Sequence, residues 1–138
     1  TLEDLRVTLY RADPIEGVTL FDNERSSSLL VQVEGAGILM TGDLPQWREL
    51  ELLQKLPPGI EVLKLGHHGS RTSSASEFIR ALNPAIVWSS HGFLNRFGHP
   101  HREVLHKVKL SGARYVTTAE SGSICFEWKS GRWHLDTP

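Results

Sequence analysis

Short apolar runs, alternating with polar residues or rich in β-branched residues, occur eight times along the chain and are typical of β-strands. They cover residues 5–10, 28–33, 37–41, 61–65, 85–89, 114–118, 123–128 and 132–135. Glu34-Gly35 and Ser130-Gly131 separate two pairs of these runs, and each predicts a tight hairpin turn. Trp128 and Trp133 flank the second turn, so we expect them to face each other across the strands.

Three segments between these strands have the spacing of amphipathic helices. Residues 45–56 carry Trp47, Leu50, Leu53 and Leu56 at every third position, open with Pro45 and stop before a proline pair. Residues 74–82 and 102–110 also place their apolar positions on one side and end at an Asn-Pro or Ser-Gly signal. We expect these faces, with the Trp47 ring, to pack on the sheet.

The alternation of strands and helices predicts an α/β domain with a mixed β-sheet and about three helices on one face. Residues 85–88 are apolar on both sides of their strand, which indicates that the second face of the sheet is also covered. The length of 138 residues suits a single domain.

Composition excludes several classes of protein. Fifteen basic and sixteen acidic residues leave a net charge of −1, so no general basic field favours non-specific nucleic-acid binding. Cys125 is alone in an apolar run, where we expect a core thiol. No apolar run is long enough to span a membrane, which predicts a soluble segment. The chain starts with Thr1 and has only Met40 as methionine, so we expect further sequence upstream.

Potential metal ligands follow three of the predicted strands. His67 and His68 stand where one apolar run ends, Asp43 ends another, and His99 and His101 lie in a loop after a third. Because ligands collect at the carboxyl ends of parallel strands, these side chains can converge. One carboxylate with several imidazoles suits zinc or manganese.

Three residues near these ligands could have either a functional or a purely structural role. Lys64 and Arg71 could contact phosphate or could be ordinary surface charges. Phe97 could stack on an unpaired base or could pack its own loop. His91, His106 and His134 are interpreted as structural.

Four motifs, in this order and spacing, resemble the metallo-β-lactamase-like domain of the ComEC family of competence DNA-uptake proteins. They are Asn-Glu-Arg-Ser at 23–26, Leu-Met-Thr-Gly-Asp at 39–43, Leu-Lys-Leu-Gly-His-His-Gly-Ser at 63–70 and Asn-Arg-Phe-Gly-His-Pro-His at 95–101. The resemblance implies that residues 1–138 form the C-terminal part of an αββα sandwich. It also implies a polytopic bacterial membrane protein, with this domain on the outer face of the cytoplasmic membrane.

The resemblance also implies roles for individual residues. Asp43 would bridge two metal positions and His68 would bind one of the ions. The candidate catalytic residues are His67, His99 and Lys64. The candidate substrate-binding residues are Asn23, Ser26, Ser70, Arg71, Asn95 and His101.

One departure from the family pattern limits this hypothesis. The principal ligand motif, His-x-His-x-Asp-His or its variant with a central aspartate, is absent from the chain and would lie upstream of Thr1. The complete domain is expected to hold two Mn or Zn ions and no small-molecule cofactor. With Asp43 and His68 alone, an ion would bind weakly or not at all, and this segment would be inactive.

Three functions remain open from the sequence. The first is a metal-dependent nuclease domain that hydrolyses DNA during uptake, with single-stranded DNA and the rest of its own membrane protein as partners. The second is a non-catalytic module that binds DNA or a neighbouring domain on the same scaffold. The third is another hydrolase of the metallo-β-lactamase superfamily, against which the four motifs argue.

Overall fold

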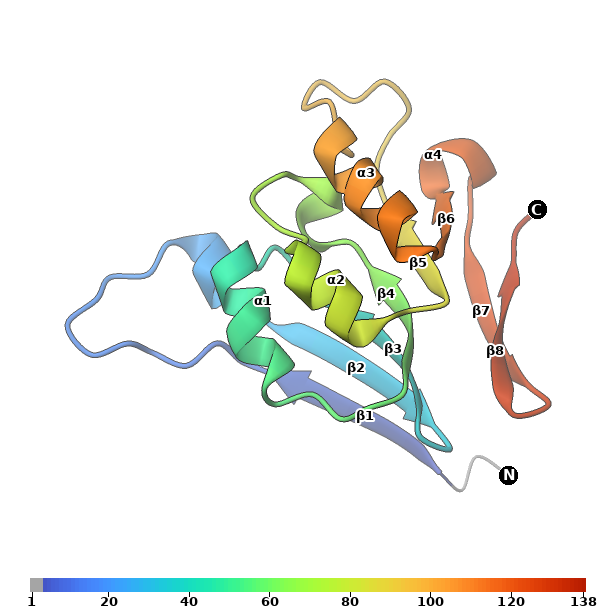
Figure 1. Cartoon of the computed structure of the whole chain (residues 1–138), viewed down its shortest axis with the longest axis horizontal. Helices are drawn as coiled ribbons and strands as arrows, with labels where there is room; N and C mark the ends of the chain where they lie inside the picture. The colour runs from blue at the N-terminus through green and yellow to red at the C-terminus, as the bar shows by residue number, and fades with distance from the viewer. Residues whose placement is uncertain (1–3) are drawn as a thin grey trace.

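The computed structural model describes residues 4–138, which form two β-sheets, four α-helices and two short 3-10 helices (Figure 1). The strands are β1 (Leu5–Tyr10), β2 (Ser28–Val33), β3 (Ala36–Met40), β4 (Ile60–Lys64), β5 (Ile86–Ser89), β6 (Arg114–Thr117), β7 (Cys125–Lys129) and β8 (Arg132–Asp136). The helices are α1 (Gln46–Leu53), α2 (Ser76–Leu82), α3 (Arg102–Ser111) and α4 (Thr118–Ser121), with 3-10 turns η1 (Asp22–Arg25) and η2 (Gly66–Gly69). The expected α/β class and mixed sheet are confirmed.

Six strands form the main sheet in the order β1-β2-β3-β4-β5-β6. The β1–β2 and β2–β3 pairs are antiparallel, whereas the β3–β4, β4–β5 and β5–β6 pairs are parallel. Glu34 and Gly35 both have positive φ, 50° and 86°, as a two-residue hairpin turn requires. The carboxyl ends of the parallel strands therefore open on one edge of the sheet.

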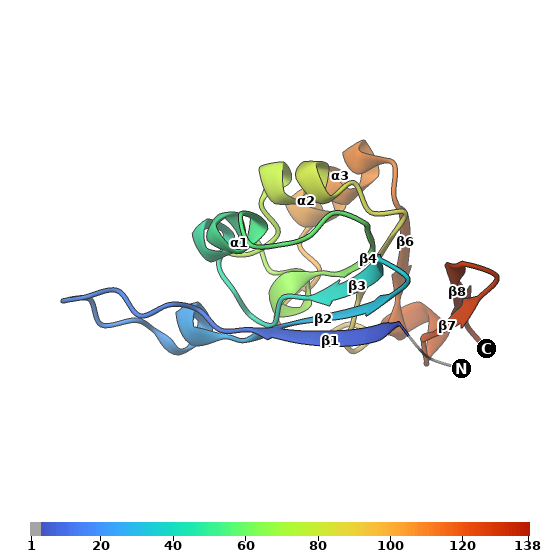
Figure 2. The ribbon, with the colours of Figure 1, turned by 90° about the horizontal axis from the view of Figure 1, so that it is seen from below.

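The helices α1, α2 and α3 all cover the same face of this sheet (Figure 2). A row of side chains crosses the strands beneath them, because Leu30, Leu39, Leu63 and Val87 pair in register. Each is at most 2% exposed, and they join Phe78 and other helical side chains in one core. Burial of this row supplies much of the free energy that fixes the strands.

The C-terminal strands form a separate two-stranded hairpin, β7-β8. Trp128 and Trp133 face each other with ring centroids 5.3 Å apart, which confirms the predicted cross-strand pair. The Trp133 indole N–H donates to the Ala36 carbonyl, 3.1 Å away, and the Phe126 ring lies 6.1 Å from that of Trp88. The hairpin therefore contacts the main sheet through aromatic side chains.

The buried face of α1 differs from the expected one. Trp47 and Leu50 are 39% and 37% exposed, whereas Arg48 and Glu49 are 3% and 1% exposed. Leu52 is buried beside them, and Leu53 and Leu56 of the expected stripe do pack, partly buried, against the core. The expected stripe is therefore wrong at Trp47 and Leu50 only. The contacts that α1 makes with the sheet and with α2, rather than its pattern, decide which side is covered.

Two further expectations need correction. Cys125 begins an outer strand and is exposed rather than in the core. The β1 residues Leu5, Val7 and Leu9 are 46%, 59% and 55% exposed, so the second face of the sheet is only partly covered by residues 4–138. Within the same range, no helix combines the length and the apolar character needed to cross a bilayer.

Candidate functional site

Three loops meet at the carboxyl ends of β3, β4 and β5, where they carry the predicted ligands. The His67 N–H donates to the Gly42 carbonyl at 2.9 Å, which joins the loop after β4 to the loop after β3. The His101 N–H donates to the Gly69 carbonyl at 3.0 Å, which joins the loop after β5 to both. We call the Asp43, His67, His68, His99 and His101 side chains the rim. Main-chain hydrogen bonds therefore bring three distant segments to one edge.

Both histidines of the η2 turn have left-handed backbone conformations, with φ of 46° at His67 and 57° at His68. Such a conformation costs a residue with a side chain about 1–2 kcal/mol. Gly69 follows with φ of 86°, and a Cβ there would lie 2.5 Å from Cβ of Pro100. The turn is thus a strained element held by its neighbours, a situation that clusters at functional sites.

The Asp43 loop is held from the other side by the segment that precedes β2. The Asp43 backbone N–H donates to the Ser26 hydroxyl at 3.2 Å. A Cβ on Gly42 would lie 2.9 Å from the Ser27 carbonyl oxygen, so the two loops touch. Asn23 lies in the exposed η1 turn, where its carbonyl accepts the Ser26 N–H. Ser26 therefore helps to place Asp43.

His68 has a defined tautomer. Its Nδ1 lies 2.5 Å from the Ser90 carbonyl oxygen, which only accepts hydrogen bonds, so Nδ1 carries the proton. The Nε2 atom, in contrast, has no hydrogen-bond partner among residues 4–138. Histidines that bind metals usually donate their other ring N–H to a carbonyl or carboxylate in this way, so the His68 geometry fits a metal ligand.

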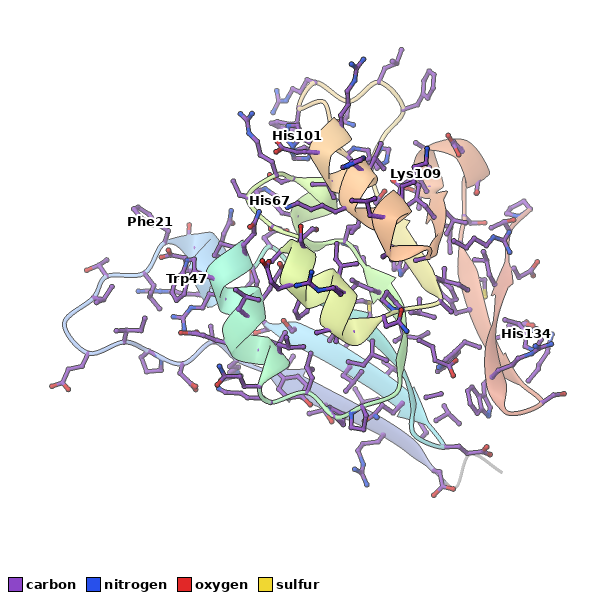
Figure 3. All side chains as sticks on the ribbon, in the orientation of Figure 1. Phe21, Trp47, His67, His101, Lys109 and His134 are labelled. Atoms are coloured by element: carbon purple, nitrogen blue, oxygen red, sulfur yellow. The ribbon has the colours of Figure 1, made fainter. Side chains whose placement is uncertain are left out.

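The other rim imidazoles form a contiguous cluster. The His99 ring centroid lies 5.7 Å from that of His67 and 4.9 Å from that of His101. Figure 3 shows His67 and His101 at the same end of the molecule. Burial, followed by the neighbouring imidazoles, lowers the pKa of His99, which favours its neutral form. The Nδ1 of His101 accepts the Arg71 N–H at 3.0 Å, so a neutral His101 carries its proton on Nε2.

Lys64 is the last residue of β4 and lies near the Asp43 loop. Its Nζ is 5.7 Å from the Trp88 ring centroid. Burial lowers the pKa of the Lys64 ammonium, and the Asp43 carboxylate opposes that shift. Lys64 therefore carries its charge close to the expected ligand without an ion pair in the described part of the chain.

The side chains of two expected substrate-binding residues already form hydrogen bonds within their own loops. Ser70 is 5% exposed, and its hydroxyl interacts with the Thr72 hydroxyl and backbone N–H. The Asn95 amide donates to the Gly92 and His99 carbonyls and accepts N–H groups of Phe97 and His99. Arg71, in contrast, is exposed. Ser70 and Asn95 hold the rim loops in shape, whatever else they contact.

Sequence reasoning missed Glu49. Its carboxylate accepts the Ser74 and Ala75 N–H groups at 2.9 and 2.8 Å, and a Cβ on Gly66 would lie 3.1 Å from Oε1. Burial raises its pKa to about 7, although these two donors and Lys107 act in the opposite direction. Glu49 has helical spacing with Leu52, Leu53 and Leu56, a signal that could have placed it on the buried face.

His91 also lies closer to the rim than its structural interpretation suggested. Its Nε2 is 2.8 Å from the Thr117 hydroxyl, and its charge contributes to the lowered pKa of His99. Its backbone N–H donates to the Thr118 hydroxyl at 3.0 Å. These contacts fasten the start of the loop after β5 to the end of β6.

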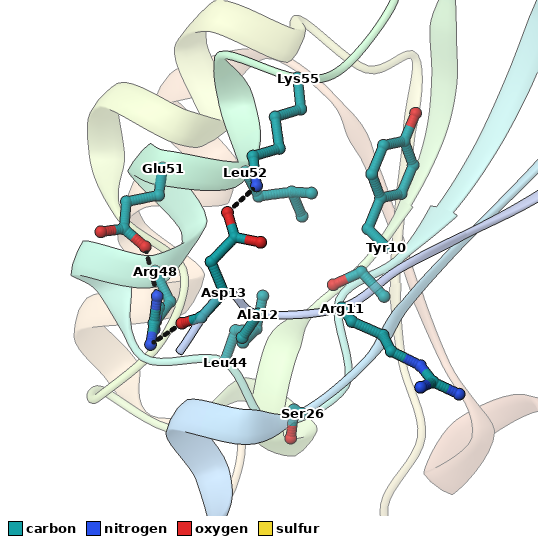
Figure 4. A pocket seen from close by; sticks show the side chains of 11 residues that line it. Tyr10, Arg11, Ala12, Asp13, Ser26, Leu44, Arg48, Glu51, Leu52 and Lys55 are labelled. Carbon is teal, nitrogen blue, oxygen red and sulfur yellow. Dashed lines mark hydrogen bonds and ion pairs between the residues drawn. The ribbon is translucent and has the colours of Figure 1, made fainter. Parts of the chain in front are cut away.

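A small pocket also lies between α1 and the segment after β1 (Figure 4). Two of its three cations are paired, because Arg48 bonds Glu51 at 2.7 Å and the Asp13 carbonyl at 2.9 Å, while Lys55 pairs with the Asp13 carboxylate. These contacts bind Asp13 to α1 and to Lys55 just beyond it. The side chains of this pocket therefore hold the segment after β1 against α1, and no imidazole of the rim lines it.

The rim holds a limited set of metal donors. Nowhere in residues 4–138 do three or more His, Cys, Asp or Glu side chains gather in an arrangement that could hold a metal ion. The donor chemistry of Asp43 and His68 nevertheless suits zinc or manganese, since both atom types bind these ions. A complete site would need further donors beside these two.

Comparison with known proteins gives a consistent result, although no family model matches the chain. The chain is 37% identical over 115 residues to Competence protein ComA of Neisseria gonorrhoeae, covering 82% of this chain and 17% of that protein. It is 36% identical over 111 residues to ComE operon protein 3 of Bacillus subtilis, covering 78% and 14%. For Recombination protein 2 of Haemophilus influenzae, the identity is 31% over 111 residues, covering 80% and 14%. The chain thus spans 14–17% of the length of these relatives.

Proposed function

Because the chain belongs, as a homologous segment, to the ComEC family of competence proteins, we propose that it serves DNA uptake by metal-dependent hydrolysis of a DNA strand. One relative is named a competence protein and another a protein of the ComE operon, which supports the uptake role. The segment would be the C-terminal part of a metallo-β-lactamase-like domain. The remainder of the protein would provide the other half of the domain and the membrane anchorage, with this domain on the outer face.

The observation that carries the proposal is the meeting of three strand ends at the rim. The Gly42–His67 and Gly69–His101 hydrogen bonds hold a carboxylate and four imidazoles at one edge of the sheet. The left-handed turn at His67 and His68 is strained, and such strain is understandable if the two rings must point to a common site. Glycine would adopt the same backbone conformation without this steric cost.

Each rim residue has a role in this proposal. Asp43 and the free Nε2 of His68 would contribute two metal ligands, with the remaining donors from elsewhere in the complete protein. When bound, divalent ions would lower the pKa of a water toward about 7 and neutralise the scissile phosphate. The Nε2–H of a neutral His101 would donate to a phosphate oxygen, and His67 and His99 would bind the same group. Lys64 and Arg71 would add positive charge beside it.

The decisive experiment uses the full-length protein purified with Mn or Zn and a labelled single-stranded DNA. Asp43→Ala should remove bound metal and lower cleavage by about 100-fold or more, since even loss of a residue behind the ligands costs about 10–100-fold. Asp136→Ala changes an exposed carboxylate at the end of β8 and should leave both measurements unchanged. The same contrast applies to His68→Ala and to His106→Ala, whose ring is exposed on α3.

The result also separates the alternatives. If metal content and cleavage survive Asp43→Ala and His68→Ala, the hydrolase proposal fails. If the wild-type protein binds DNA but neither binds metal nor cleaves, the non-catalytic module is the better description.

A further inference from the structure

A pocket lies directly beside the rim, on the side of His99 that faces α4. Its apolar walls come from Phe93, Leu94, Leu105 and the Tyr115 ring. Polar groups of Asn95, Thr117 and Glu120 stand at its edge, together with His91 and His99. His99 therefore belongs both to the imidazole cluster and to this pocket, and any molecule held by both would lie across its ring.

The loop between β5 and α3 presents apolar side chains to solvent at an energetic cost. This loop projects beyond the ends of β5 and α3 at the top of Figure 1. Phe93 and Leu94 are 76% and 87% exposed, and Leu94 has a left-handed φ of 49°. The four hydrogen bonds of the Asn95 amide hold the loop in this shape. A strained leucine beside an exposed phenylalanine indicates a surface built to contact something.

The second aromatic ring of the loop has a different environment. Phe97 stacks on His99 with centroids 5.7 Å apart and an interplanar angle of 26°, and the Arg96 guanidinium lies 4.8 Å from the Phe97 centroid. The Phe93 ring makes no aromatic stacking contact and no cation–π contact with residues 4–138. Phe97 thus supports His99, whereas the ring of Phe93 is available to a ligand.

The polar edge of the pocket selects the kind of ligand. The Tyr115 hydroxyl interacts with Ser89 and the Thr117 hydroxyl with His91, so both are already partnered. The Glu120 carboxylate makes no hydrogen bond or ion pair with the described residues, and it can accept hydrogen bonds from a ligand. A flat ring with N–H groups along its edge satisfies the aromatic walls and this acceptor together, whereas a lipid chain would leave the carboxylate beside hydrocarbon.

We propose that this pocket receives an unpaired nucleobase of the DNA strand whose phosphate lies on the rim imidazoles. The inference rests on the proposed function and extends it with a base-binding subsite. Phe93 stacks on the base, Leu94 and Leu105 close the apolar side, and Glu120 accepts from the edge of the base. Only a single strand fits, because a paired base would hide both the face and the edge that the pocket contacts.

The test measures binding of the chain to a labelled oligothymidine and to an abasic oligonucleotide of the same length by fluorescence anisotropy, without metal. The wild-type chain should bind the base-bearing strand more tightly. Phe93→Ala should weaken that binding about tenfold, within the range for loss of one stacked base, and should not change binding of the abasic strand. Phe21→Ala is the matched control, because Phe21 is 79% exposed, stands just before η1 and does not line the pocket.

Each outcome bears on the pocket independently of hydrolysis. Equal binding of the two oligonucleotides, an unchanged affinity of Phe93→Ala for oligothymidine, or no binding of either strand overturns the subsite. Asp43→Ala should retain the preference for bases, since the pocket does not use Asp43. If cleavage by the full-length protein proves independent of Asp43 while base preference depends on Phe93, the hydrolase proposal fails and the subsite stands.

Discussion

The face of the sheet under the helices and the rim at its carboxyl edge are built on different principles. Under the helices, Leu30, Leu39, Leu63 and Val87 pack in a continuous apolar row. At the rim, backbone hydrogen bonds and left-handed residues position polar side chains that stabilise the fold little. We therefore expect stability to come mainly from the helix-covered face, which would allow the rim to keep an unfavourable conformation.

The largest expected effect comes from truncating the core row. Leu63→Ala removes a side chain that is 2% exposed at the centre of the sheet, and it should lower the free energy of unfolding by about 2–5 kcal/mol. Leu110→Ala, at a position 73% exposed on α3, should change it by less than about 0.5 kcal/mol. Urea denaturation of both variants measures the contrast, and equal effects would show that the core has been misassigned.

Glu49 lies on the buried side of α1 and next to Gly66 of the η2 turn, and its titration gives the second-largest expected effect on stability. Its folded pKa of about 7 lies above the ordinary value of 4.5, so the native state holds an extra proton between these pH values. Its contribution to stability is therefore complete below pH 4.5 and is lost as the pH rises through 7, amounting to about 3 kcal/mol.

The test of Glu49 compares urea denaturation across this pH range. Glu49→Gln should flatten the decline in stability, whereas Glu51→Gln, at a side chain 50% exposed, should preserve it. A decline that persists in Glu49→Gln would assign the pH dependence to other groups.

The strained turn gives a smaller effect. Gly69→Ala and Gly112→Ala both place a side chain at positive φ, 86° and 77°, but only the first meets another atom, at Pro100. Gly69→Ala should therefore cost about 1–3 kcal/mol more than Gly112→Ala, the range for overpacking. Thermal or urea unfolding gives the difference, and amide chemical shifts should change across the three rim loops. Equal losses of stability in the two variants would mean that the loop at Pro100 can move aside without an energetic cost.

The smallest effect is expected at the rim itself. His101→Ala removes the acceptor of the Arg71 N–H, which water can replace, so the free energy of unfolding should fall by less than about 1 kcal/mol. His106→Ala is the exposed control on α3. A loss comparable to that of Leu63→Ala would contradict the division between a stabilising face and a functional rim.

Sequence patterns predicted the elements well where local chemistry dominates. The strand runs, the Glu34-Gly35 hairpin and the Trp128–Trp133 pair all follow from alternation and turn preferences over a few residues. The α4 helix escaped notice because it has only four residues. The buried side of α1 was misjudged because Trp47 and Leu50 are apolar yet half-exposed, while Glu49 is buried and bonded to two backbone N–H groups.

By itself, the sequence determined the α/β class, the order of the elements and the position of Asp43 and the histidines at strand ends, since these depend on periodicity and local chain stops. Only the tertiary structure decided the tautomer of His68, the left-handed turn, the occupied amide of Asn95 and the pocket at Phe93. Each of these depends on atoms far apart in the chain that meet after the core has packed. Periodicity carries no information about such distances, because it reports which side of an element is buried and not what lies opposite.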